Sequence, residues 1–299
     1  MTKISSSLVA ELRKITDAGI MDCKKALLAA NGDIEQAIEG LRNVGQAKAV
    51  KKSGRIAAEG LVAIAINNLK TQAYILEINC ETDFVAREEK FQEFCKQLAQ
   101  LALSAKVTSI EELSKQKLDN ATVEEQRLEL ISKVGENISL RRLEMLTCEP
   151  GASIGEYLHG GAMVARIGSL VALNTNDLEL AHDVAMQVAA MKPEFIDESQ
   201  IPAERLAKEK EFFMTQAREE HANKPDDVLE KIIAGKLKKF IKEVTLADQA
   251  FFKDTDKTMQ QLLDSKNAQV VKFIRYEVGE GIEKKEDDFA NEVMAQVNA

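Results

Sequence analysis

The sequence predicts an α+β protein in several parts: a three-helix N-terminal domain, a core of two related α+β subdomains with antiparallel sheets, a protruding helical hairpin and a short C-terminal helical module. Three observations support this prediction. Apolar residues recur at helical spacing in the first 45 residues. Two later stretches each run strand, strand and helix, which indicates a duplicated unit. Two helical stripes of about 20 residues flank a short turn with Pro225, which is typical of an antiparallel helical hairpin.

Size and composition are those of an ordinary globular chain with more than one domain. The chain has 299 residues, 45% hydrophobic and 30% charged, which suits a sizeable core and argues against disorder. A net charge of −9 argues against a nucleic-acid-binding surface over much of the protein. The four cysteines are scattered without a Cys-x-x-Cys pair, and with only three histidines neither a disulfide framework nor a zinc site is expected. No apolar leader and no run of about 18 apolar residues is present, so a cytoplasmic protein without a membrane segment is predicted.

The N-terminal domain is assigned to residues 1–53. Ser6 or Ser7 can cap a first helix, Asn31-Gly32 ends a second helix as a left-handed cap does, and Asp33 begins a third with a capping box. Three short helices around one small core resemble the ubiquitin-associated type of domain, which is more often a docking unit than an enzyme. The apolar stripes of these helices are Leu8, Val9, Leu12 and Ile15; Met21, Cys23, Ala26, Leu27 and Leu28; and Ile34, Ala37, Ile38 and Leu41.

A basic run with Lys48, Lys51, Lys52 and Arg55 follows this domain. It can contact an acidic partner or RNA, or it can be a solvated linker, and the linker is the favoured interpretation. Glycines at positions 54 and 60 mark the hinge into the next domain.

The first core subdomain is assigned to residues 54–147. Residues 60–79 predict a hairpin of two strands around a polar turn. A turn with Thr82, Asp83 and Phe84 then leads into a helix over residues 86–104. Asp83 can be a helix N-cap and Phe84 a core residue. Alternatively, a large ring beside an acid on a tight exposed turn is a probe that is pushed into a partner, and composition leaves both interpretations open.

The rest of this subdomain is predicted as helix, helix and strand. A short exposed helix is expected within residues 111–125, and a second helix ends near Gly135. Residues 138–146 predict a strand on which Arg141 and Arg142 are exposed.

The second core subdomain is assigned to residues 148–190 and 236–276. Residues 163–165 and 169–173 predict a second hairpin. Asn174 and Asp177 then lead into a helix. In the first unit Asn79 and Asp83 do the same, with one more residue between them. Asp177 is followed by a leucine, so an aspartate suffices for such a turn and the phenylalanine belongs to one copy only. This comparison favours a specific role for Phe84.

The helical hairpin is assigned to residues 191–235, although apolar spacing continues to Val244, and the C-terminal module to residues 277–299. Two helices alone expose part of their apolar stripe, so the hairpin either forms a homodimer contact with a second copy of the chain or folds back onto its own domain. The heptads are too short to decide. Residues 270–278 predict a strand that ends at Gly279, and a final short helix carries Phe289, Val293 and Met294.

Several separate motifs lie along the chain in one order. They are Leu12-Arg13, residues 16–26, residues 30–33, residues 79–85, residues 134–137, His159-Gly160, residues 192–195 and residues 273–282. Together they resemble, almost end to end, the elongation factor Ts family of bacterial-type nucleotide exchange factors for elongation factor Tu. A lone Thr-Asp-Phe would not be specific, whereas the ordered set is.

The resemblance implies a partner and a site. The partner is the GTPase elongation factor Tu in its GDP-bound state. In the family, one segment dislodges the Mg²⁺ of this partner and so promotes GDP release, and it corresponds here to Thr82, Asp83, Phe84 and Val85. Further partner contacts are implied for Leu12, Ile20, Met21, His159 and Gly160. Position 20 is Ile where the best-known relatives carry Met, and an apolar contact survives that exchange. The resemblance implies no enzymatic activity, no cofactor or metal of the chain's own, and no direct contact with nucleic acid or membrane.

Two other hypotheses compete with this interpretation. A ubiquitin-like or RNA-binding adaptor would act through the N-terminal domain and the basic run, and its binding would survive deletion of residues 54–299. An enzyme would use His159, Cys80 and Asp83, but the sequence has no Gly-rich phosphate loop, nucleophile elbow or HExxH motif.

Overall fold

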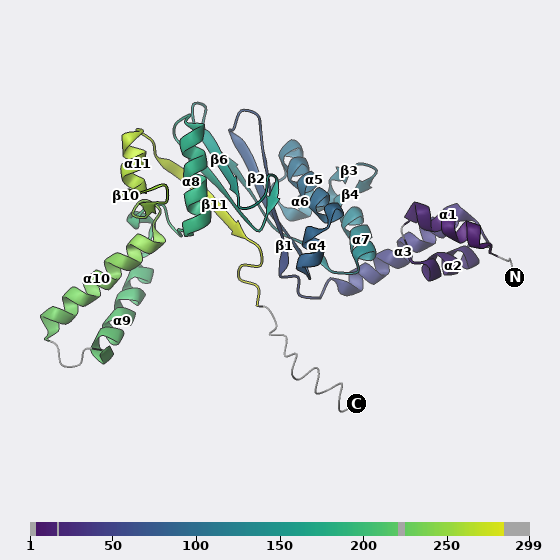
Figure 1. Ribbon diagram of the computed structural model, residues 1–299, viewed down its shortest axis with the longest axis horizontal. Helices are drawn as coiled ribbons and strands as arrows, with labels where there is room; N and C mark the ends of the chain where they lie inside the picture. Colours follow the sequence, from purple (N-terminus) through teal and green to yellow (C-terminus); the bar gives the residue numbers. More distant parts are fainter. Residues whose placement is uncertain (1–3, 17, 221–224, 284–299) are drawn as a thin grey trace.

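The computed structural model of the chain describes residues 4–16, 18–220 and 225–283. This part is elongated, with a three-helix module at one end, a helical hairpin at the other and two β-sheets with their helices between them (Figure 1). The chain is an α+β protein with antiparallel sheets, as predicted. The final helix predicted around Phe289, Val293 and Met294 lies outside the described residues.

The N-terminal module packs α1 (Ser6–Thr16) and α2 (Ile20–Ala29) against the first half of α3 (Ile34–Lys52) around a small apolar core. Ser5, one residue before the predicted cap, accepts a hydrogen bond from the backbone amide of Leu8. The end of α2 is as predicted, because the residues at positions 31 and 32 have φ angles of 50° and 92°. The carboxylate at position 33 accepts from the backbone amide three residues on, which begins α3.

Helix α3 continues beyond the small core and reaches the next domain. Its 19 residues span roughly 28 Å at about 1.5 Å per residue. The basic run predicted as a linker belongs mostly to this helix, since Lys51 and Lys52 form its last turn. Lys52 Nζ donates to the backbone oxygen of Gly135 at 2.6 Å. The end of α3 is therefore attached to the core and is not a free linker.

The first subdomain contains a four-stranded antiparallel sheet in the order β5-β2-β1-β7. Strands β1 (Glu59–Ile66) and β2 (Gln72–Cys80) form the predicted hairpin. Strand β5 (Ile138–Thr147) pairs with β2, and the short β7 (Val164–Ala165) pairs with β1.

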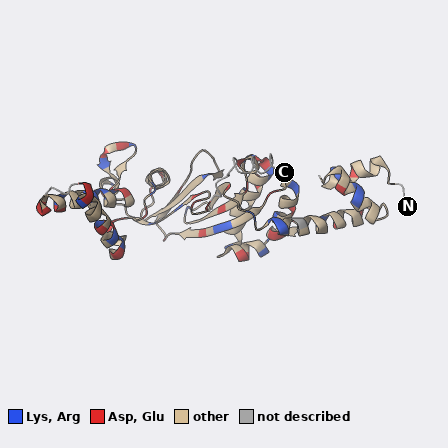
Figure 2. Cartoon of the chain, turned by 90° about the horizontal axis from the view of Figure 1, so that it is seen from below, with Lys and Arg blue, Asp and Glu red and all other residues tan. Residues whose placement is uncertain are grey.

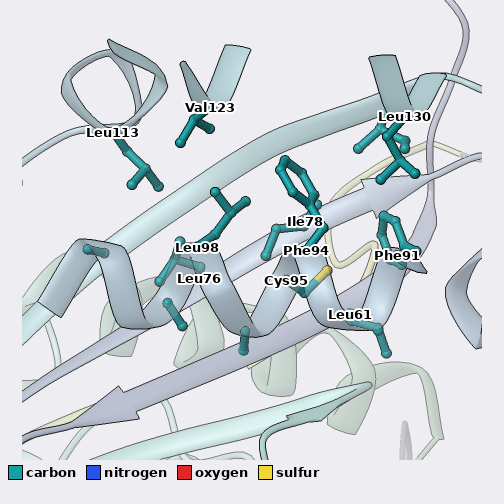
Figure 3. Close-up of a cluster of buried hydrophobic side chains, with 14 of the residues drawn as sticks. Leu61, Leu76, Ile78, Phe91, Phe94, Cys95, Leu98, Leu113, Val123 and Leu130 are labelled. Carbon is teal, nitrogen blue, oxygen red and sulfur yellow. The ribbon is translucent and has the colours of Figure 1, made fainter. Parts of the chain in front are cut away.

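The helices of this subdomain lie on one face of the sheet. After β2 the chain forms α4 (Asp83–Arg87), breaks at Glu88 and continues as α5 (Glu89–Ala105), so the predicted single helix is two. Large buried side chains of α5 pack on β1 and β2 (Figure 3), which fixes the sheet and the start of α4 together. The chain then returns to β5 through α6 (Ile110–Lys115), β3 (Lys117–Leu118), β4 (Ala121–Thr122) and α7 (Val123–Val134).

The second subdomain has a three-stranded antiparallel sheet, with β8 (Ile167–Leu173) between β6 (Ser153–Leu158) and β11 (Val270–Glu277). The hairpin predicted from residues 163–165 and 169–173 is wrong, because the first stretch is β7 of the other sheet and β8 pairs with β6. Strand β6 was not predicted, and Gly155 gives the reason. A Cβ atom there would lie 2.1 Å from a backbone oxygen of α8 (Leu178–Met191), so close packing requires a residue that weakens the strand pattern.

The two subdomains form four layers, α5, sheet, sheet and α8. Alternate residues of each strand face opposite sides, so Leu61 and Ala63 of β1 pack toward α5 while Val62 and Ile64 face the second sheet. In β8, Val171 packs toward α8 and Leu170 faces the first sheet. The two subdomains therefore share one apolar layer between their sheets.

A buried carboxylate also joins the subdomains. Glu77 on β2 is fully buried and accepts hydrogen bonds from Arg141 at 3.0 and 3.1 Å, Arg142 Nε at 2.5 Å, Asn79 Nδ2 at 3.0 Å and the backbone amide of Gly279 at 2.8 Å. Burial alone would raise the pKa of Glu77, but these hydrogen bonds and the charge of Arg142 outweigh it, so the pKa is lowered. The two arginines, predicted to be exposed, are instead half-buried partners of this carboxylate.

The helical hairpin consists of α9 (Ala203–Glu220) and α10 (Asp226–Val244). Because α10 is unbroken to Val244, the predicted boundary at residue 235 is too early. Both helices carry acidic and basic residues (Figure 2), while Ala217, Leu229 and Ile233 form a small apolar core between them. None of the described helices is long and apolar enough to cross a membrane. The remaining elements are the 3-10 helix η1 (Glu198–Gln200), β9 (Ala250–Phe251), β10 (Asp254–Thr258) and α11 (Met259–Ser265).

Candidate functional site

The candidate site is the junction between β2 and α4, here called the Phe84 turn (residues 81–85). Strand β2 ends at Cys80 and α4 begins at Asp83. The N-cap is Thr82, whose backbone is extended and whose Oγ1 accepts from the Val85 amide at 3.4 Å. The interpretation of Asp83 as the N-cap is therefore wrong, because Thr82 caps the helix and Asp83 is its first residue.

Phe84 and Val85 point in opposite directions. Val85 is 5% exposed and belongs to the apolar core under the sheet, whereas Phe84 is 75% exposed. The interpretation of Phe84 as a core residue is wrong. Most of the Phe84 ring is therefore accessible at the surface of the described chain.

Among the residues that the structure describes, Asp83 pairs with Arg87. Its carboxylate lies 2.7 Å from the Arg87 guanidinium, one helical turn away, and both side chains are largely exposed. Exposed pairs of this kind are worth about 0.3–0.5 kcal/mol. The pair therefore contributes little to the stability of the chain.

A second loop, residues 135–137 after α7, lies directly against the Phe84 turn. The Glu136 carboxylate accepts from the backbone amide of Thr82 at 3.0 Å and from its hydroxyl at 2.7 Å. The backbone amide of Asn137 donates to the Glu81 carboxylate at 2.6 Å. Sequence reasoning did not assign Glu136 or Asn137 to the site, although both fall in the motif at residues 134–137.

Cys80 has no chemical role at this junction. The thiol is fully buried and donates to the backbone oxygen of Thr82 at 3.1 Å. Burial raises the pKa of Cys80 to about 12, so a reactive thiolate does not form near neutral pH. The hypothesis of an enzyme with Cys80 as nucleophile is therefore not supported. The described residues contain no cluster of three or more side chains that could hold a metal ion.

The N-terminal module presents only part of the predicted contact surface. Ile20 and Met21, at the start of α2, are 54% and 62% exposed. Leu12 is completely buried in the core of the module, where it packs with α2. The prediction that Leu12 contacts the partner directly is therefore corrected. Ile15 and Val44 are also exposed and line a groove of about 1450 Å³ between this module and the helices α5 and α7 of the core.

His159 and Gly160 lie in the second subdomain, just after β6. His159 is exposed, and its Nδ1 lies 3.1 Å from the Tyr157 hydroxyl. Gly160 has a φ of 82°, a conformation that favours glycine. The candidate residues thus lie near α2, α4 and the end of β6 along the elongated molecule (Figure 1) and do not converge on one pocket. This distribution is typical of an extended protein–protein surface.

Comparison with known proteins agrees with this picture. The family model described as Elongation factor TS matches residues 81–280. A protein from Thioalkalivibrio sulfidiphilus named Elongation factor Ts is 50% identical over 98% of both chains. Relatives of the same name from Legionella pneumophila and Pseudoalteromonas atlantica are 52% and 49% identical over at least 98% of each chain.

These matches identify the class of protein as a translation elongation factor, which takes part in protein biosynthesis. Within that class, the chain belongs to the elongation factor Ts family.

Proposed function

We propose that this chain binds elongation factor Tu in its GDP-bound state and promotes release of GDP by inserting the Phe84 turn beside the Mg²⁺ site. The observation that supports this proposal is the 75% exposure of the Phe84 ring on a turn whose neighbours Val85 and Ala86 are buried. The buried side chains of Val85 and Ala86 anchor the turn, and the Phe84 ring extends from it into solvent, as insertion into a partner requires.

The energetics need no chemical step by the chain itself. If the chain and GDP bind the same GTPase and oppose each other, each weakens the affinity for the other by the same factor. The chain must bind the nucleotide-free state more tightly than the loaded state, and this difference sets how far the equilibrium moves. An exposed ring and a weakly paired carboxylate are suited to that task, because both gain contacts only on the partner.

Phe84 and Asp83 would act on different parts of the partner. Burial of the ring between helices of the GTPase domain gains about 1.5–3 kcal/mol, which offsets the strain of separating them. Asp83, released from Arg87, can engage groups that support the metal ligands. Because Mg²⁺ demands near-ideal octahedral geometry, a small displacement of such groups weakens its binding.

The other exposed candidates would hold the two proteins together. Ile20 and Met21 offer an apolar surface on the N-terminal module, and helix α3 fixes that module to the core that carries the Phe84 turn. His159 and Gly160 would add a contact from the second subdomain. Docking at separate places aligns the wedge before it enters.

The test is release of fluorescently labelled GDP from elongation factor Tu with Mg²⁺ present. The intact chain should accelerate release, and Asp83→Ala and Phe84→Ala should each slow the accelerated reaction while thermal unfolding stays unchanged. Glu149→Ala is the matched control for loss of a carboxylate, because Glu149 lies at an exposed loop position outside the Phe84 turn. Wild-type rates for both Asp83→Ala and Phe84→Ala would show that the proposed site is wrong.

A further inference from the structure

The residue that caps α4 is held by a residue distant in sequence. Glu136 accepts two hydrogen bonds from one residue, through Oε2 from the Thr82 amide at 3.0 Å and through Oε1 from the Thr82 hydroxyl at 2.7 Å. The same hydroxyl oxygen accepts from the Val85 amide at 3.4 Å. The carboxylate therefore holds both the backbone amide and the side chain of Thr82, the N-cap of α4.

Glu136 itself stands on a firmly held loop. Its neighbour Asn137 is 4% exposed, donates from its backbone to Glu81 at 2.6 Å and donates from Nδ2 to the backbone oxygen of Arg55 at 2.8 Å. Lys52 Nζ binds the backbone oxygen of Gly135 at 2.6 Å. With both neighbours fixed to the end of α3 and to the turn, the Glu136 carboxylate has little freedom to follow a displaced Thr82.

We propose that Glu136 is a positioning residue that orients Phe84 for insertion, without itself contacting the GDP that is released or its metal ion. The inference deepens the proposed function and rests on it, because Phe84 is the group that Glu136 serves. A short helix of five residues such as α4 has few internal hydrogen bonds, so its first turn depends on the cap and on what holds the cap. If the turn were free to move, it would absorb the strain that a wedge has to impose on its partner.

A double-mutant cycle on stimulated GDP release tests this role. Glu136→Gln keeps the shape of the side chain but removes its negative charge and replaces one of its two acceptor oxygens by an NH₂ group. We expect release to slow about tenfold in the otherwise wild-type chain, as for loss of a hydrogen bond to a charged group. In the Phe84→Ala background the same change should slow release less than about twofold, because the group being positioned is gone. Glu149→Gln, at an exposed loop position, is the charge-matched control and should leave both backgrounds unchanged.

Two results would overturn the proposal. Equal effects of Glu136→Gln in both backgrounds would place its action elsewhere than on Phe84, and wild-type release by Glu136→Gln would show that the turn needs no such support. If Glu136→Gln does not fold, the same cycle is run with Thr82→Val and Thr82→Ser. Thr82→Val loses the hydroxyl that binds Glu136 and should slow release, whereas Thr82→Ser retains the hydroxyl and should release GDP at the wild-type rate.

Hydrogen exchange of the free chain separates this inference from the proposed function. The amides of Thr82 and Val85 should exchange faster in Glu136→Gln than in the wild type, with the amides of β1 unchanged. Unaltered protection at both positions would refute the positioning role. If protection falls as expected but Phe84→Ala releases GDP at the wild-type rate, Glu136 orders the turn and it is the proposed exchange site that fails.

Discussion

Replacing Phe84 by alanine gives the sharpest test, because its effect on binding and its effect on folding should separate completely. Full burial of a phenylalanine side chain contributes about 1.5–3 kcal/mol. Phe84 leaves 75% of its surface exposed, so the part still to be buried on a partner corresponds to about 1.1–2.3 kcal/mol. Since about 1.4 kcal/mol equals a factor of ten, the second-order rate constant of stimulated GDP release should fall about 6- to 40-fold.

The assay is stopped-flow release of labelled GDP at a series of chain concentrations, paired with thermal unfolding of each variant. Phe84→Ala should unfold within about 0.5 kcal/mol of the wild type, as surface changes do. Val85→Ala removes a buried side chain next to it and should lose about 2 kcal/mol of stability. Phe212→Ala, on the exposed face of α9, is the matched control for loss of a phenyl ring. If Phe84→Ala unfolds early, or releases GDP as fast as Phe212→Ala does, the wedge argument is refuted.

Further predictions concern the N-terminal module, the buried carboxylate and the hairpin. Leu12→Ala should destabilise the module by about 2–5 kcal/mol in urea unfolding, whereas Met21→Ala should leave stability unchanged and weaken binding to elongation factor Tu by about 1 kcal/mol in calorimetry. Because the pKa of Glu77 is lowered in the folded chain, its stabilising contribution is present above the ordinary carboxyl value of 4.5 and is lost as the pH falls through the folded-state pKa. Unfolding free energies measured between pH 7 and pH 3 should show this loss, and Glu77→Gln, although less stable at pH 7, should show a smaller one. Phe212 is 61% exposed on the hairpin, so if a homodimer forms there, Phe212→Ser should yield monomers in sedimentation; a monomeric wild type would contradict the contact.

The sequence patterns predict those parts of the fold that rest on local signals. The β1–β2 hairpin, the cap at Asp33 and the end of α7 at Gly135 follow from alternation, capping and glycine at a positive φ, and each is present. Strand β6 and the pairing of β7 with β1 depend on contacts between distant segments. Gly155 removes the local strand signal at the point where helix α8 lies closest.

The candidate site divides in the same way. Phe84 and Asp83 stand out because a ring and an acid occur at a strand-to-helix junction, and their exposure agrees with that interpretation. Leu12 belongs to the same motif as Met21, yet only the structure separates a residue that supports the surface from one that forms it. Glu136 could not be assigned from sequence, because its two hydrogen bonds connect residues 54 positions apart.

The duplicated unit shows why the phenylalanine and the turn are separate requirements. In the second copy Asp177 caps α8, because its side chain accepts from the Leu180 amide at 3.0 Å. Asp177 comes three residues after Asn174, and Thr82 likewise comes three residues after Asn79. The extra residue in the first copy disappears once Thr82, not Asp83, is matched to Asp177. Both copies therefore form the same junction, and the fold needs only a side chain that caps the helix. Phe84 is not the cap of that junction, and three quarters of its surface is exposed. In the function proposed above, contact with a second protein accounts for Phe84, which lies on the copy whose helix cap also binds Glu136.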